Sequence, residues 1–239
     1  MVTGIRMPTQ SAERRAGDDL PLLLWLSPAF PVGSYAYSHG LEWAVEAGDI
    51  RDAASLAAWL DDLLGHGAPR SDAVLFACAW RAARAADWPA LDAINELAIA
   101  LGGSSERRLE AVAQGGAFLS AMRAAWPCAA FAHWPEDAAA PLAYPVAVAF
   151  AAAGHGLSLE ASLPAFMLGF QANLVSAAIR LGAIGQTDGQ RVLARLTPLV
   201  RAQASILERA TLDDLGSCAL RADIAAMKHE TQYSRLFRS

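Results

Sequence analysis

Ser38 and His39 form an adjacent pair whose side chains could carry out nucleophilic catalysis. They lie in the pentapeptide Ala36-Tyr37-Ser38-His39-Gly40, which approximates the G-x-S-x-G turn of serine hydrolases. That turn needs a buried β-strand directly before the serine, so that the hydroxyl is held in an exposed position. Residues 28–34 contain two prolines and a glycine and cannot form a regular central strand. The sequence therefore argues against a serine hydrolase, which we keep as an alternative.

Residues that could bind a metal or a nucleotide are scattered along the chain. Cys78, Cys128 and Cys218 form no C-x-x-C pair, and the five histidines are equally dispersed. The sequence contains no phosphate-binding loop, no H-E-x-x-H motif and no dinucleotide-binding fingerprint. We therefore expect no stably bound cofactor and no metal site. The sparse cysteines are typical of a reducing compartment such as the cytoplasm.

Three segments combine polar, aromatic and basic side chains in ways that indicate contact surfaces. The first, residues 26–42, contains prolines, glycines, aromatics and hydroxyls, and includes Tyr35. It is either a rigid loop folded over the following helix, with Ser38 or His39 as its cap, or a binding surface. The residues alone leave both interpretations open.

The second segment places polar residues within an apolar helical stretch. Gln171, Asn173 and Ser176 lie within two turns of one another, and Arg180 follows at the helix end. Buried polar groups of this kind need hydrogen-bond partners and often fix how two helices dock. Arg180 could instead reach a carboxylate or phosphate of a partner.

The third segment is the C-terminal tail, residues 228–239. Its charge is opposite to that of the whole chain, because three basic residues accompany one glutamate. Arginines and large apolar side chains alternate in it, as they do at the centres of protein interfaces. The alternative to an interface is a chain end that is simply frayed. The residues expected to anchor a partner here are Tyr233, Arg235, Leu236 and Phe237.

Composition and periodicity predict an all-α fold. Hydrophobic residues make up 54% of the 239 residues and charged residues 18%, which argues against disorder. We expect one helical bundle-like domain over residues 19–227, after a mobile N-terminal extension at residues 1–18 and before a C-terminal tail that a partner orders. Helices are predicted at about 53–64, 71–87, 89–101, 105–126, 142–153, 159–181, 188–209 and 218–228.

Two details of these helices can be checked directly. Ser71 is the expected cap of the second helix, and Ser104 or Ser105 that of the fourth. In the fourth helix, Arg107, Arg108 and Glu110 are expected to face solvent, because charged side chains are seldom buried.

Charge and hydropathy argue against binding to nucleic acid and against insertion into a membrane. A net charge of -5 is unfavourable for binding nucleic acid. Residues 138–159 and 161–179 carry no formal charge, which keeps a membrane protein as an alternative. The first stretch is broken by prolines and glycines, and the second carries polar residues that are costly in lipid. We therefore expect no membrane-spanning segment.

The three segments together resemble signatures of the UreF family of urease accessory proteins. The similar runs are residues 26–42, residues 173–190 and residues 229–237, in the same order as in the family. Small departures are Ala36 in place of a common serine, Lys228 in place of arginine, and Ala183-Ile184 in place of proline-leucine. The last of these would make the turn before Gly185 less rigid.

This resemblance implies a protein without catalytic activity that forms a homodimer and assembles with other maturation proteins. The implied partners are the scaffold protein UreD (also called UreH), the GTPase UreG and apo-urease, and nickel would pass in transit to urease. The tail residues named above would contact UreD. The GTPase-facing residues would be Tyr35, Ser38, His39, Arg180 and Gln186. For Arg180, contacts that organise the complex are favoured over an arginine-finger role in GTP hydrolysis.

Overall fold

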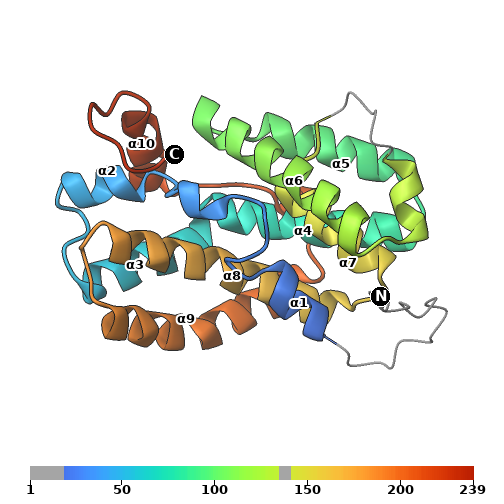
Figure 1. The fold of residues 1–239 in the computed structure, drawn as a ribbon, viewed down its shortest axis with the longest axis horizontal. Coiled ribbons are helices and arrows are strands. Elements are labelled where there is room, and N and C mark those ends of the chain that lie inside the picture. The colour runs from blue at the N-terminus through green and yellow to red at the C-terminus, as the bar shows by residue number, and fades with distance from the viewer. Residues whose placement is uncertain (1–18, 135–140) are drawn as a thin grey trace, which may run out of the picture.

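A computed structural model describes residues 19–134 and 141–239, and every regular element within them is a helix (Figure 1). This confirms the all-α prediction. The expected extension at residues 1–18 lies outside the described residues. The α-helices are α1 (Leu20–Trp25), α2 (Leu41–Glu46), α3 (Ala53–His66), α4 (Ala68–Arg84), α5 (Trp88–Ala100), α6 (Ser105–Ala125), α7 (Tyr144–Gly154), α8 (Leu159–Arg180), α9 (Gln186–Leu207) and α10 (Leu220–His229). Short 3-10 turns are η1 (Ser34–Ala36), η2 (Ala129–His133) and η3 (Leu212–Asp214).

The centre of one half of the bundle is α7, which packs against α4 and α6 (Figure 1). Pro145 to Ala153 are all buried, and most of them are small, so neighbouring helices approach closely. Gly115 of α6 lies close to the backbone that leads into α7. A Cβ atom built there would lie 2.0 Å from the carbonyl oxygen of Leu142. The glycine is therefore required for α6 to pack on the start of α7.

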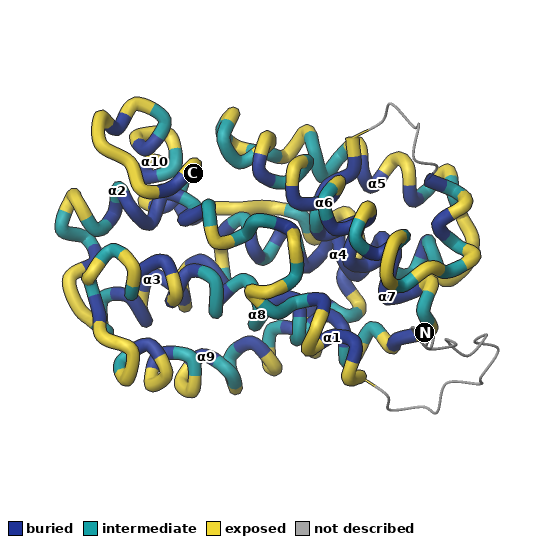
Figure 2. The backbone as a smooth tube through the Cα atoms, viewed as in Figure 1, coloured by how far each residue is buried: buried dark blue, intermediate teal, exposed yellow. Residues whose placement is uncertain are grey.

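The other half is built from α2, α3, the second half of α8, the first half of α9, and α10. Two long helices connect the halves. In α8, Phe166 belongs to the core around α7 while Leu174 belongs to the core around α3. In α9, Val200 belongs to the core around α7 and Leu196 to the core around α3. Figure 2 shows buried segments in both halves, alternating with exposed ones along the helices.

The helix α8 is long and apolar enough to cross a membrane by length and composition, and half of its most apolar window is buried inside the protein. It packs against α4, α2 and α9. Its buried surface therefore explains why the sequence carries an uncharged stretch at this position.

Helix ends follow the sequence signals in part. Ser104 caps α6 by accepting a hydrogen bond from the amide of Arg107, as expected. The α4 helix, however, begins at Ala68 rather than after Ser71. Pro69 supplies a preorganised first turn, and the Ser71 hydroxyl instead donates to the carbonyl of Gly216 at 3.2 Å.

Candidate functional site

The three segments that sequence analysis singled out meet at one place, between α2, α6, the end of α8 and the C-terminal tail (Figure 1). The amide and hydroxyl of Ser38 both donate to the carbonyl oxygen of Ser239, each at 2.6 Å. The Glu42 carboxylate accepts the backbone amides of Leu236 at 2.7 Å and Phe237 at 3.0 Å. Tail and loop are thus joined although about 200 residues separate them.

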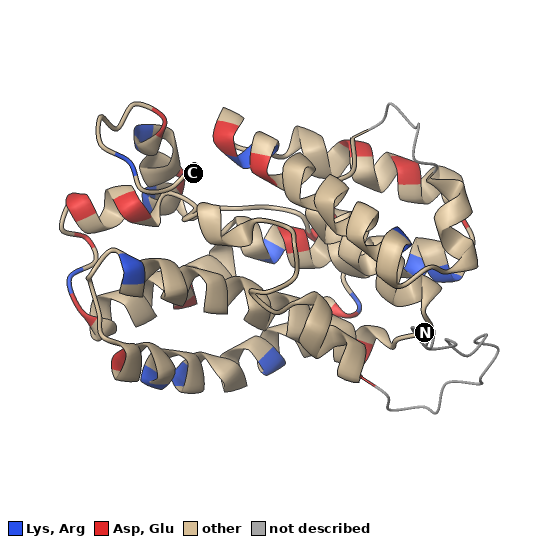
Figure 3. Ribbon diagram, viewed as in Figure 1, with Lys and Arg blue, Asp and Glu red and all other residues tan. Residues whose placement is uncertain are grey.

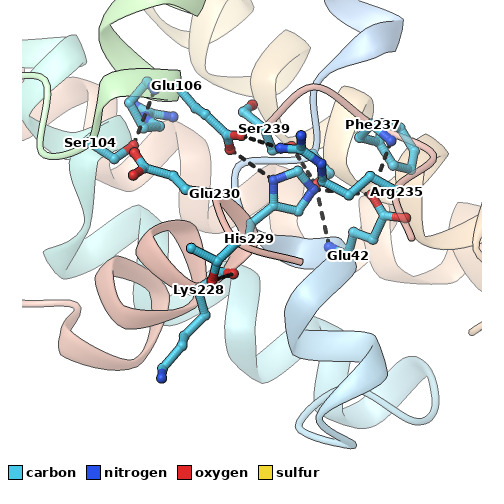
Figure 4. Close-up of polar contacts among 12 residues, drawn as sticks. Glu42, Ser104, Glu106, Lys228, His229, Glu230, Arg235, Phe237 and Ser239 are labelled. Atoms are coloured by element: carbon cyan, nitrogen blue, oxygen red, sulfur yellow. Dashed lines mark hydrogen bonds and ion pairs between the residues drawn. The ribbon is translucent and has the colours of Figure 1, made fainter. Parts of the chain in front are cut away.

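His229 is the central side chain of this site (Figure 4). Its side chain is fully buried, with Nε2 lying 3.1 Å from the Glu42 carboxylate and Nδ1 lying 2.8 Å from that of Glu106. Both ring nitrogens therefore face carboxylate oxygens. Arg235 adds a second contact to Glu106 at 2.6 Å. This group of charges holds α2, α6 and α10 together.

Two further contacts fix α10 against its neighbours. The Glu230 carboxylate accepts the amide of Ser105 at 2.9 Å and its hydroxyl at 2.8 Å, at the first turn of α6 (Figure 4). These hydrogen bonds lower the pKa of Glu230. At Gly40, which has a φ of 75°, a Cβ atom would lie 2.5 Å from the amide nitrogen of Ala226. Backbone contact therefore sets the spacing of α2 and α10.

Arg180 lies between the loop and the tail. Its guanidinium donates to the carbonyl of Tyr35 at 2.5 Å and sits over the Phe237 ring, 4.3 Å from the ring centre. From the preceding turns of the same helix, Asn173 donates to the carbonyl of Tyr37 at 3.2 Å. Asn173 and Arg180 thus position the loop, as expected for groups that fix docking inside the chain. The buried side chain of Gln171, in contrast, has no hydrogen-bond partner among the described residues.

Below this network lies a second group of charges that includes His39. Its Nε2 is 2.8 Å from the Glu110 carboxylate, which also accepts the Ser239 hydroxyl at 3.0 Å. Burial raises the pKa of Glu110 to about 7, despite the opposing charge of Arg107. Burial, with the Glu110 charge, raises the pKa of Asp72 to about 7 as well.

The expectation that Arg107, Arg108 and Glu110 face solvent is confirmed for Arg108, which is exposed, and wrong for the other two. Glu110 is only 3% exposed, and the Arg107 side chain is directed inward, 3.6 Å from Asp72. Helical periodicity does not reveal this burial, because these residues have partners in α4, in the loop before α2 and at the end of the tail. Glu106, Glu110 and Asp72 were therefore missed as site residues, while Glu42 lay within the first segment without an assigned role.

The sequence-predicted residues differ in how they are presented. Tyr35 and Leu236 are exposed, and Tyr233 projects fully into solvent. Phe237, in contrast, is 4% exposed and packs inside its own chain. Gln186 is exposed at the first turn of α9 and is not joined to the network by any hydrogen bond among the described residues.

The geometry also bears on catalysis and metal binding. The Ser38 hydroxyl is buried and donates to Ser239, and no strand precedes it in the described part of the chain, so the hydrolase turn is not formed. Within the described residues, no group of three or more His, Cys, Asp or Glu side chains could hold a metal ion.

Comparison with known proteins identifies the family. A sequence model of the UreF family matches residues 50–197. The urease accessory protein UreF of Xanthobacter autotrophicus is 57% identical over 92% of this chain and 90% of its own length. That of Methylorubrum populi is 54% identical over 93% of this chain and 99% of its own length. The meeting of the three signature segments and these relationships together place the chain in the UreF family of urease accessory proteins.

Proposed function

We propose that this chain is a non-catalytic scaffold that bridges UreD and the GTPase UreG on apo-urease and couples GTP hydrolysis to nickel delivery. Membership of the UreF family makes it a urease accessory protein that acts in urease maturation. The proposed contacts with UreD and UreG rest on one observation, that the loop within residues 26–42 is joined to the C-terminal tail. Buried ion pairs there support a surface with exposed Tyr35, Tyr233 and Leu236.

The UreD contact is proposed on the tail and the exposed apolar face of α10. Tyr233, Leu236 and Arg235 project from the tail, and exposed apolar side chains continue along α10. Such exposed apolar groups are typical of an interface. Phe237 supports this surface from within, because its ring packs under Arg180.

The GTPase contact is proposed on the loop around Tyr35, with Gln186 at its periphery. Ser38 and His39 hold this loop from beneath through Ser239 and Glu110. Arg180 acts as a positioning residue, since its guanidinium already binds the Tyr35 carbonyl and the Phe237 ring. We favour this organising role over an arginine finger, which would have to leave both contacts.

Three further elements of the proposal rest on the family resemblance. The scaffold works as a homodimer in the cytoplasm, and nickel passes in transit without a stable site on this chain. The acidic and imidazole groups around His39, Asp72 and Glu110 line cavities inside the protein. Scattered ligands of this kind bind a divalent ion weakly, which suits passage better than storage.

The test is complementation of a strain that carries urease but lacks this gene. We expect the deletion strain to make full-length urease with little nickel, and the wild-type chain to restore both nickel and activity. The double variant Tyr233→Ala/Leu236→Ala should fail to restore activity and fail to co-purify with UreD. The matched control is Leu109→Ala/Leu212→Ala, which removes exposed apolar side chains elsewhere.

Normal urease nickel in the deletion strain would contradict the maturation role itself. Normal UreD binding by the tail variant would contradict only the assignment of the tail to UreD.

A further inference from the structure

A cavity of about 400 Å³ lies between α10 and helices α4, α5 and α6. Four large apolar side chains at its edge are unusually exposed: Leu101 at 48%, Leu220 at 67%, Ile224 at 54% and Met227 at 53%. Three of them belong to α10, on the helix face that the proposed function assigns to a partner. We call this space the α10 cavity.

The inner wall of the α10 cavity carries charge. Asp72 and Asp223 both line it, together with Arg107. The Arg107 guanidinium lies 3.6 Å from the Asp72 carboxylate and also acts on the charge of Asp223. Two carboxyl groups thus face one guanidinium. His39 also lines this wall, and its Nε2 lies 2.8 Å from the Glu110 carboxylate.

The carboxyl groups are poorly compensated in this chain by itself. Burial raises the pKa of Asp72 to about 7 and also raises the pKa of Asp223. Both carboxyl groups are partly buried, and a partly desolvated carboxylate gains from an additional cationic partner. A cation entering the cavity would supply the missing partner, while an anion would add repulsion.

We propose that the α10 cavity receives a basic anchor side chain, arginine or lysine, from the partner protein that docks on α10. This inference rests on the proposed docking of a partner there and adds the chemistry of the contact. The apolar edge suits the methylene stem of such a side chain, and the acidic wall suits its charged end. Buried arginines of this kind are common energetic centres of interfaces.

Other anchors fit less well. An aromatic or aliphatic side chain would fill the apolar edge but leave Asp72 and Asp223 further desolvated without supplying a second cation. A carboxylate would meet two like charges. Charge complementarity therefore selects a cation with an apolar stem.

The first test uses small probes on the full chain. Binding of n-hexylammonium, n-hexanol and n-hexanoate is measured by NMR chemical-shift titration. We expect hexylammonium to bind at least five-fold more tightly than the other two. Asp72→Asn/Asp223→Asn should remove this preference, whereas Asp61→Asn/Asp62→Asn, which alters exposed carboxylates on α3, should keep it. Equal binding of the three probes, or an unchanged preference in the cavity variant, would overturn the proposal.

The second test uses the purified UreD-type partner. We expect Asp72→Asn/Asp223→Asn to weaken its binding at least ten-fold, and Leu220→Glu/Met227→Glu to abolish it. If only the glutamate variant weakens binding, the docking face stands and the basic anchor is wrong. If neither variant weakens binding, the partner does not dock on α10, and both the anchor and this part of the proposed function fail.

Discussion

His229 lies at the centre of the site and contacts carboxylates from two other helices. Its two ring nitrogens contact Glu42 of α2 and Glu106 of α6, and the ring is fully buried. Removing the ring leaves two carboxylates facing an empty space, one of which also holds the tail amides. Removing one partner from a buried group of charges is far more costly than replacing the whole group with well-packed apolar side chains.

We expect His229→Ala to lower the free energy of unfolding by about 2 to 4 kcal/mol. Urea denaturation followed by circular dichroism measures this. The control is His66→Ala at an exposed ring, which should change stability by less than about 0.5 kcal/mol. Equal losses in the two variants would show that the carboxylate contacts of His229 do not stabilise the fold.

The Glu110 carboxyl makes stability depend on pH. Its pKa rises from 4.5 to about 7 in the folded chain because of burial, so the folded state holds a proton that the unfolded state releases. Stability is therefore greatest at low pH for this group and falls as pH rises from about 4.5 through 7. Asp72 acts in the same direction.

Glu110→Gln should accordingly reduce this loss of stability. Between pH 5 and pH 8, the free energy of unfolding should fall by about 1 to 3 kcal/mol less in the variant than in the wild-type protein. Thermal unfolding at a series of pH values tests it, with Glu96→Gln as the exposed control. A wild-type slope that persists in Glu110→Gln would rule out this carboxyl as the source.

At the scale of elements, two neighbouring glycines of α6 have opposite surroundings. A Cβ atom at Gly115 would lie 2.0 Å from the Leu142 carbonyl oxygen, whereas nothing lies within 4 Å of one at Gly116. Both positions are helical, so the intrinsic preference for alanine over glycine is the same.

Gly115→Ala should therefore destabilise the protein by about 3 kcal/mol or more, because α6 must move away from α7. Gly116→Ala should stabilise it by about 0.5 to 1 kcal/mol. Chemical denaturation of the pair separates the packing effect from helix propensity. Similar shifts in the two variants would contradict the close approach of these helices.

Most elements could be predicted from the sequence because their signals are local. Ser104 caps α6 through a contact three residues away, and periodic leucines mark the buried face of α3. The start of α4 could not be placed at Ser71, since Pro69 competes as a first-turn residue and Ser71 has a distant partner in Gly216. Local patterns do not contain that partner.

At the scale of the whole molecule, α8 and α9 each contribute to both cores. Neither half can lose its packing without uncovering part of a helix that the other half needs. We expect unfolding to be a single cooperative transition, in which tryptophan fluorescence and far-UV circular dichroism change together. Two separated transitions would mean that the halves unfold independently.

The candidate site shows where sequence reasoning ends. The three segments could be recognised one at a time, since aromatic and basic residues in an apolar chain are conspicuous. That Ser38 meets Ser239, and that His229 lies between Glu42 and Glu106, depends on the folding of the whole chain. The inward position of Glu110 follows from the same long-range contacts and could not be read from α6 alone.

The complete burial of the α7 segment from Pro145 to Ala153 has a consequence for backbone exchange with deuterated water. Amides in the middle of α7 can exchange only when the entire bundle opens, so their rate reports the global unfolding free energy. Amides of α10, which has an exposed outer face, can exchange through smaller local openings. Each exchange rate can be converted into an opening free energy. The opening free energy of α10 measures how firmly α10 and the tail are held closed on the bundle, and it is obtained without any substitution in the chain.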